Sequence, residues 1–410
     1  MTDMEIFKWE LMKIWRKRST KVVVIIAIAY VIFSAIYNGV LNLGSTKNEG
    51  FGQNPDGVKR IAEQYEFAQQ YRGDMTEEKL LDVYERVQAA YAPKNIVEFP
   101  DGSRGLSNEN WNKYIEPIIS PINMMMNLCR MIPDYESVYQ PKSIPRNAAE
   151  DFYSLREETV ESFISTQVLD EIDREFFLKQ NSEVKTPFYY DWIEGQRIYL
   201  EIMAPIPVIV ALLIAVFISP VCALEYQQKT DSVILCSRYG RRNLALAKLS
   251  ASVIFSAAVY IVCMGIYIGG QLFFCGTRAL SCPIQLIKPI AAAPLTILQA
   301  EIYLIVLGFL SCIAITAVTF LLSSAINFVF PAAAASMMLI VAPMLLSGTI
   351  PESLSFISVL PFMSDYTELF RTNMYFHIWS PYLMIAAPIF IFVICAPLGV
   401  WKFRTHQTAK

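Results

Sequence analysis

Six long apolar runs are the feature that most constrains the fold of this 410-residue chain. They cover residues 22–43, 202–224, 249–274, 302–322, 328–347 and 381–401. An α-helix rises about 1.5 Å per residue, so about 20 residues cross the roughly 30 Å hydrocarbon core of a bilayer. No run has a charged residue in its middle, where Arg, Lys or Asp costs about 3 kcal/mol on insertion. The sequence therefore predicts an all-α membrane protein with six transmembrane helices.

The first run has a second interpretation because basic residues precede it, as they do in a secretory signal peptide. Its apolar stretch is longer than the ~7–15 residues usual in such a peptide, and no small-residue cleavage site follows it. We predict an uncleaved anchor, with a cleaved signal peptide as the alternative.

Charge divides the chain into two parts. Residues 45–199 hold 27 Asp and Glu against 17 Lys and Arg, which leaves 10 acidic and 17 basic residues elsewhere. Only 17% of the whole chain is charged, whereas a soluble domain usually carries about 25% charge. This division predicts an acidic soluble domain, residues 45–199, inserted between the first two spans of a basic membrane protein.

The insert has the pattern of a mainly helical domain. Residues 58–71 and 75–91 place apolar side chains three and four positions apart, and residues 148–180 predict one long helix or two. Its excess of acid fits a solvated surface, and the alternative is a site for a cation or a peptide.

The distribution of Lys and Arg predicts the orientation. With six spans, the stretches 1–21, 225–248 and 402–410 lie on one side of the membrane. That side holds 14 Lys and Arg, whereas the short loops opposite hold three. Basic loops stay in the cytoplasm. We therefore expect both termini in the cytoplasm, the insert outside, and the chain in the cell membrane.

Two shorter segments have the pattern of surface elements. In the cytoplasmic stretch 1–21, an amphipathic helix is predicted whose apolar face comprises Met4, Phe7, Leu11, Met12, Ile14 and Trp15, with Ile6 and Trp9 outside the pattern. The alternative is a plain basic flank. Residues 349–380 have apolar pieces too short to cross, which favours an external re-entrant hairpin over a surface loop.

The sequence lacks the motifs of an enzyme. There is no Walker-type GxxxxGK[ST], and the two histidines, His377 and His406, lie outside the spans. We predict no catalytic residues, no cofactor and no metal site. Gly265 and Gly269 form a GxxxG pattern for helix packing, within the chain or between two chains. Cys275 and Cys282 are both external and are a candidate disulfide.

The cytoplasmic loop 225–248 is more elaborate than a simple connector. It has a short apolar centre, Val233–Leu235, followed by an Arg-rich turn around Gly240. Such a segment suits a short helix offered to a soluble partner, with Arg side chains available for carboxylates or phosphates. The alternative is that its bases only fix topology or contact anionic lipid.

The loop resembles that of the permease subunits of type-2 ABC exporters (the ABC-2 family). The residues that carry the resemblance are Glu225, Thr230, Val233–Leu235, Ser237, Arg238, Gly240, Arg241 and Lys248. Lys229 stands where the family pattern has Gly. The resemblance implies a coupling helix that docks on a separate ABC ATPase subunit, and a second permease chain around a central path. The implied contacts are Glu225, Asp231, Val233, Ile234, Leu235, Arg238, Tyr239, Arg241 and Lys248.

The sequence thus favours the permease of an ATP-driven exporter, with the lipid bilayer as its medium and no nucleic-acid partner. A multi-pass sensor or scaffold with an external ligand-binding domain is one alternative, and a secondary transporter is another. Apolar spans without buried charge favour an amphipathic substrate, whose identity the sequence leaves open.

Overall fold

The structure is a computed structural model that describes residues 3–42, 57–99, 102, 104–135, 137–168, 170–230, 242–345, 372–373 and 378–406. The chain divides into two compact units. Unit 1 comprises Met1–Ala35, Glu201–Gly269 and Ile302–Lys410. Unit 2 comprises Ile36–Leu200 and Gly270–Glu301.

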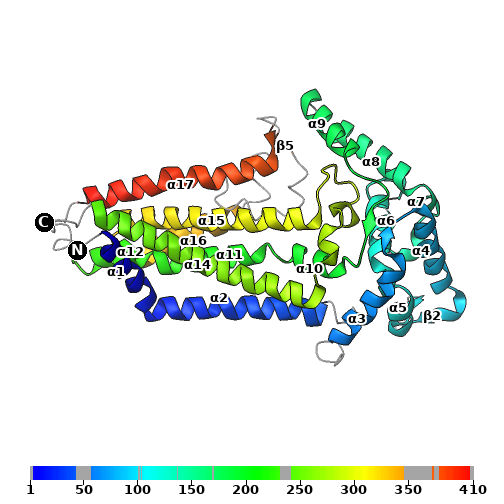
Figure 1. Cartoon of the computed structure of the whole chain (residues 1–410), viewed down its shortest axis with the longest axis horizontal. Coiled ribbons are helices and arrows are strands. Elements are labelled where there is room, and N and C mark those ends of the chain that lie inside the picture. Colours follow the sequence, from blue (N-terminus) through cyan, green and yellow to red (C-terminus); the bar gives the residue numbers. More distant parts are fainter. Residues whose placement is uncertain are drawn as a thin grey trace. The chain divides into compact units, whose positions relative to one another are not determined.

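Long apolar helices make up unit 1 (Figure 1). In chain order they are α1 (Asp3–Arg16), α2 (Arg18–Ile36), α11 (Pro205–Ile218), α12 (Pro220–Gln227), α14 (Arg242–Cys275), α15 (Ile297–Ala325), α16 (Val329–Leu345) and α17 (Ser380–Thr405). α14 and α15 contribute residues to both units. Two short strands, β5 (Thr372–Asn373) and β6 (Ile378–Trp379), pair antiparallel before α17.

Five of the predicted spans fall in stretches long and apolar enough to cross a membrane. These are Arg18–Val40, Glu194–Gln227, Arg242–Cys275, Ile297–Ala325 and Pro381–Thr405. The remaining prediction, 328–347, coincides with α16, whose 17 residues give a helix of about 26 Å. The residues that follow α16, 346–371, lie outside those described, as does most of the hairpin predicted at 349–380. The described chain is an all-α, multi-pass membrane protein.

Small residues bring α16 against the middle of unit 1. Ala332, Ser336 and Ile340 recur every four residues and are buried, and α16 contacts α11 and α12. Small side chains of this kind let helix backbones approach closely. By contrast, α17 exposes Ile389 and Phe390 on its surface, as expected of a helix that faces lipid.

The predicted N-terminal helix is present as α1, and the side that packs inside unit 1 includes Ile6, which lay outside the predicted apolar face. The buried side chains of α1 are Ile6, Glu10 and Ile14, which are four residues apart and so share one face. Met4, Met12 and Trp15 of the predicted face are exposed, and so is Trp9. The helix therefore presents apolar residues on two sides, one packed on unit 1 and one open.

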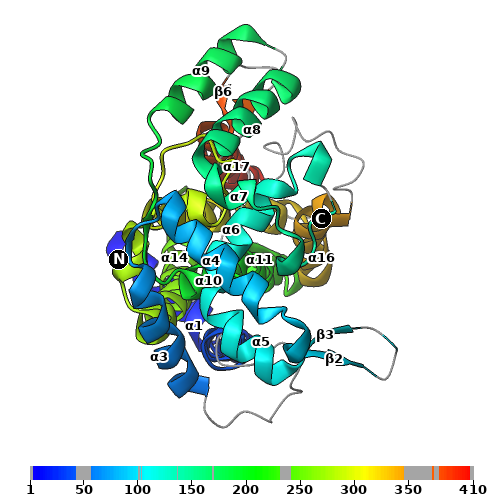
Figure 2. The same ribbon diagram turned by 90° about the vertical axis from the view of Figure 1, so that its right-hand side faces the viewer.

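Unit 2 is a bundle of shorter helices (Figures 1 and 2). They are α3 (Gly57–Ala68), α4 (Glu77–Ala90), α5 (Asn108–Tyr114), α6 (Ile119–Cys129), α7 (Asn147–Glu150), α8 (Phe152–Gln167), α9 (Glu171–Ser182) and α10 (Glu194–Glu201). Two-stranded pieces of sheet join β1 (Gly73–Asp74) to β4 (Tyr189–Tyr190) and β2 (Ile96–Glu98) to β3 (Arg104–Leu106). α4, α7 and α8 all contact α6, whose Met125 and Leu128 are fully buried.

The helices predicted in the insert are confirmed, with small shifts of their ends. Residues 58–71 and 75–91 correspond to α3 and α4, and 148–180 forms two principal helices, α8 and α9. α4 starts at Glu77 because Thr76 caps it, its side chain accepting a hydrogen bond from the Lys79 amide at 3.4 Å.

Residues 270–301 complete unit 2, which the sequence did not indicate. Arg156 of α8 is 3% exposed and donates from Nε to the Pro289 carbonyl at 2.8 Å and from an amino group to the Ala291 carbonyl at 3.0 Å. Gln285 donates to the Ala291 and Ala293 carbonyls at 3.0 and 2.8 Å. Burial lowers the pKa of Arg156 to about 10. These bonds fasten the 285–293 segment to α8.

Candidate functional site

The candidate site lies at the end of α12, the helix that leads into the predicted coupling loop. α12 is separated from α11 by Ser219 and begins at Pro220, and a proline has no amide hydrogen for the helical ladder. The Ser323 side chain of α15 bonds the backbone on both sides of this break. Its hydroxyl oxygen accepts from the Cys222 and Ala223 amides at 3.0 and 3.1 Å and donates to the Ser219 carbonyl at 2.6 Å. The start of α12 is thereby fixed to α15.

The last turn of α12 contacts four other helices through three consecutive residues, which we call the α12 junction (Glu225, Tyr226 and Gln227). Glu225 pairs with lysines of α1 and α14. The Tyr226 ring stacks on His406, just after α17, with centroids 3.9 Å apart. The Gln227 side chain accepts from the amide of Val329, the first residue of α16, at 3.4 Å. Any displacement of this turn therefore reaches α1, α14, α16 and α17.

A buried lysine is the centre of the charge pairing at the junction. Lys248 of α14 is completely buried. Its ammonium group lies 2.7 Å from Glu225 Oε1, 3.0 Å from Glu10 Oε2 of α1 and 3.1 Å from the Val221 carbonyl. Removing a charge from water costs several kcal/mol unless its partners compensate. Here three oxygens satisfy the three ammonium hydrogens.

Two further lysines complete the set that we call the lysine–glutamate cluster (Glu10, Lys13, Lys17, Glu225 and Lys248). Lys13 Nζ donates to Glu225 Oε1 and lies 3.7 Å from Glu10 Oε1. Lys17, between α1 and α2, is partly buried near the four other charges of the cluster. Burial, together with Lys13 and Lys248, lowers the pKa of Lys17 to about 8, although Glu225 and Glu10 act in the opposite direction. The cluster therefore holds three lysines on two carboxylates.

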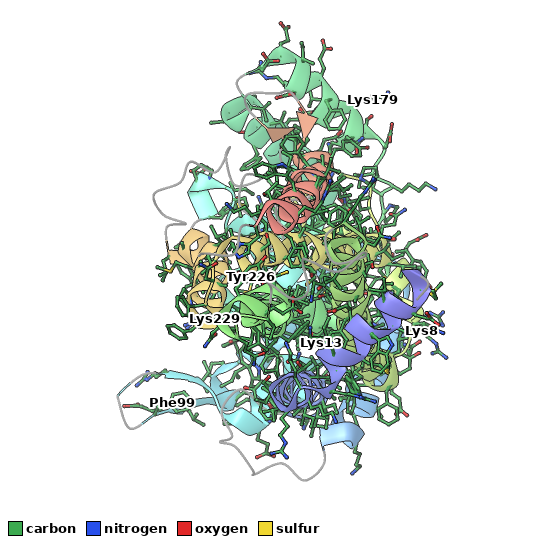
Figure 3. All side chains as sticks on the ribbon, turned by 90° about the vertical axis from the view of Figure 1, so that its left-hand side faces the viewer. Lys8, Lys13, Phe99, Lys179, Tyr226 and Lys229 are labelled. Carbon is green, nitrogen blue, oxygen red and sulfur yellow. The ribbon has the colours of Figure 1, made fainter. Side chains whose placement is uncertain are left out.

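Figure 3 views unit 1 from the end that carries these groups, with Lys13 on α1 and Tyr226 on α12 labelled. Lys8, earlier on α1, is exposed. The cluster ties α1 to the two helices that flank the loop.

The end of α12 has a left-handed backbone conformation at Lys229. The Thr230 amide donates to the Glu225 carbonyl and the Lys229 amide to the Tyr226 carbonyl, both at 3.0 Å. This is the Schellman arrangement, in which the residue after the cap adopts the left-handed conformation. Lys229 has φ of 57°. The backbone thus keeps the conformation that glycine adopts most easily, at a cost of about 1 kcal/mol for a residue with a side chain.

The structure brings together two of the predicted contact residues, Glu225 and Lys248, and adds Glu10 and Lys13, which the sequence analysis missed. Glu225 and Lys248 are buried inside unit 1 and bind each other. Seven other predicted contacts lie outside the described residues, namely Asp231, Val233, Ile234, Leu235, Arg238, Tyr239 and Arg241. The signal for Glu10 was an acid flanked four residues away on each side by isoleucine, at Ile6 and Ile14.

The two GxxxG glycines lie on an open face of α14. Gly265 and Gly269 are exposed, and a Cβ added at either would meet no atom within 4 Å. Packing within the described chain therefore does not explain them.

The predicted Cys275–Cys282 disulfide is not present, since both thiols are free. Cys275 packs against Gly195, where an added Cβ would lie 2.4 Å from the sulfur. The Cys282 thiol is buried and bonds the Asp191 backbone. The Cys275 sulfur thus lies against Gly195 and the Cys282 sulfur against the Asp191 backbone, and burial raises the pKa of Cys282 to about 12.

The described residues contain no group of three or more His, Cys, Asp or Glu side chains able to hold a metal ion. Ser311 and Thr316 are fully buried in α15, and Thr316 donates to the Cys312 carbonyl at 2.8 Å. Searches of the chain against family models, curated proteins and solved structures found no match.

Proposed function

We propose that this chain is the permease subunit of an ATP-driven exporter of the ABC-2 type, coupled to a separate ATPase through residues 225–248. The proposal counts α16 as the fifth of six spans and places both termini and the α12–α14 loop in the cytoplasm, as the distribution of bases favours. Unit 2 then carries the external domain.

The α12 junction is the observation that carries the proposal. A soluble motor can only act on the spans through a segment that is rigidly linked to them. The loop begins with a turn, Glu225–Gln227, that contacts α1, α14, α16 and α17. A simple connector does not require such links at its base. In this arrangement Glu225 and Lys248 position the loop from inside, and the apolar residues Val233–Leu235 make the contact with the ATPase.

The partner chain is proposed to contact the open face of α14. Gly265 and Gly269 are exposed on it, together with Ile261, and small residues in membrane helices permit close approach of a second helix. Changing Gly265 to Leu leaves the fold of one chain intact, because space is available, and breaks the pairing of two chains. Mass photometry of the purified protein in nanodiscs measures this change.

Co-purification tests the coupling. Tagged wild-type protein, extracted gently from its native membranes, is expected to carry a Walker-motif ATPase that mass spectrometry identifies. Replacing Val233, Ile234 and Leu235 together by Asp is expected to remove it. Phe328→Asp is the matched control, because Phe328 is an exposed apolar residue in the next loop on the same proposed side. Retention of the ATPase by the triple variant, or its absence from wild type, contradicts the proposal.

A further inference from the structure

The α8–α9 hairpin of unit 2 packs against the segment around residues 289–292. Val160 and Ile164 of α8 pack with Phe177 of α9 against Ala292, and Arg156 fastens the base of α8 to the same segment. Figure 2 shows the two helices side by side. The hairpin therefore has a fixed position within unit 2.

An open groove of about 500 Å³ runs along the hairpin. Its lining includes Glu158, Glu161, Ile164 and Ser165 from α8 and Arg174 and Leu178 from α9. Ile164 and Leu178 give the groove an apolar part, and the two glutamates, one helical turn apart, give it an acidic edge. The groove thus combines an apolar surface with negative charge.

The positive charges of the hairpin are largely committed elsewhere. Arg174 donates to the Ser165 and Val168 carbonyls at 3.4 and 3.1 Å, and its buried Nε–H has no acceptor among the described residues. Arg156 faces carbonyls inside unit 2. Among the described residues of α8 and α9, one base, Lys179, is exposed, against five exposed carboxylates: Glu157, Glu158, Glu161, Glu171 and Glu175.

Large apolar side chains stand among these carboxylates. Phe163 is 45% exposed, Ile172 is 68% exposed and Leu178 is 37% exposed. A surface that only had to stay soluble has no need of three such groups in two short helices. Acidic and apolar groups together complement a molecule that carries cationic and apolar groups on opposite faces.

We propose that the α8–α9 groove binds a cationic amphipathic peptide. Its Lys or Arg side chains pair with Glu158 and Glu161, and its apolar face covers Leu178. This binding goes beyond the proposed export function and needs neither nucleotide nor an ATPase.

The test uses the purified full chain in nanodiscs of zwitterionic phosphatidylcholine. The probe is a fluorescent helical peptide made only of Lys and Leu, and binding is followed by fluorescence anisotropy. The expected result is saturable binding that weakens as the salt rises from about 50 to about 300 mM, because the contacts are charge pairs near the surface. The same peptide with Glu in place of Lys is expected not to bind.

The double variant Glu158→Gln/Glu161→Gln is expected to weaken binding roughly fivefold at low salt, since two exposed ion pairs are lost. Glu63→Gln/Glu66→Gln on α3 is the matched control, with the same spacing, the same change of charge and exposed positions, and it is expected to leave the dissociation constant unchanged. Leu178→Ser is expected to weaken binding with little change in its salt dependence.

Three outcomes overturn the proposal. Equal affinity of the two double variants shows that the peptide binds elsewhere. Binding to empty nanodiscs that matches binding to the loaded ones shows that lipid is the receptor. A shift to larger particles in wild type that Leu178→Ser abolishes, without peptide binding, shows that the hairpin contacts a second copy of the chain.

Discussion

Each unit buries a cation, and the two cations are stabilised in different ways. Lys248 in unit 1 is held by two carboxylates from two other helices, Glu10 and Glu225. Arg156 in unit 2 is held by the neutral carbonyls of Pro289 and Ala291. Breaking the first arrangement leaves unpaired charges on several helices of unit 1, whereas breaking the second releases one segment of unit 2 from α8. The proposed function requires the helices around the cluster to move, and a group of mutually dependent charges would link their movements.

The largest expected effect is that of Lys248→Met, which leaves two buried carboxylates without their central partner. Breaking a buried pair by removing one member costs about 3–5 kcal/mol. Thermal unfolding in detergent measures the loss. The triple variant Lys248→Met/Glu10→Gln/Glu225→Gln is expected to recover part of the stability, because no carboxylate is then left without its lysine, although Lys13 and Lys17 lose their acidic neighbours. If the triple variant is no more stable than the single one, the cluster acts by packing and not by charge.

Arg156→Met tests the other side of the comparison. Two hydrogen bonds from a charged donor are lost, and the net cost is about 2–3 kcal/mol. Because the lost partners are neutral, no second substitution is expected to rescue it. Limited proteolysis is expected to cut within residues 285–293 of the variant and not of wild type. Unchanged protection of that segment would mean that Gln285 alone holds it.

Lys17→Met tests the charge balance of the lysine–glutamate cluster through the pH dependence of folding stability. The pKa of Lys17 is about 8 in the folded chain, against 10.5 for an ordinary lysine. The unfolded chain therefore binds more protons between these values, and the stability of wild type rises with pH across that window. Below pH 8 the variant is expected to be more stable by about 1 kcal/mol, after allowance for solvent screening. This advantage disappears by about pH 10.5.

Thermal unfolding at pH 7 and pH 10 measures the effect of Lys17→Met. Lys8→Met serves as the control, because Lys8 is an exposed lysine of the adjacent helix. A difference between Lys17→Met and wild type that stays constant from pH 7 to pH 10 contradicts the cluster's excess of positive charge.

The smallest expected effect is a gain in stability from Lys229→Gly, of about 0.5–1 kcal/mol, because glycine adopts positive φ without a steric penalty. Lys229→Ala, which still carries a Cβ, is expected to give no gain. Equal unfolding temperatures of the Gly and Ala variants would indicate that the backbone here is not constrained as described.

The spans were predictable because bilayer thickness fixes their length, and the insert helices were predictable because their apolar spacing is local. The polar contacts could not be predicted from the sequence. Glu10 resembles any acid on the polar side of a surface helix until Lys248, 238 residues away, is placed beside it. The fastening of residues 285–293 by Arg156 is equally non-local. The presence of Lys at position 229, where the resemblance leads one to expect Gly, was visible in the sequence. That this residue has a positive φ could be seen only from the hydrogen bonds at the end of α12.

Unit 2 is assembled from two pieces of chain, Ile36–Leu200 and Gly270–Glu301, separated by α11, α12 and most of α14. During synthesis the first piece therefore emerges about 100 residues before the second is finished. At about 5–20 residues per second, that delay is roughly 5–20 s. For this interval α8 exists without the carbonyls that Arg156 binds in the finished protein, so the cell must protect a half-built domain while the intervening helices are being made.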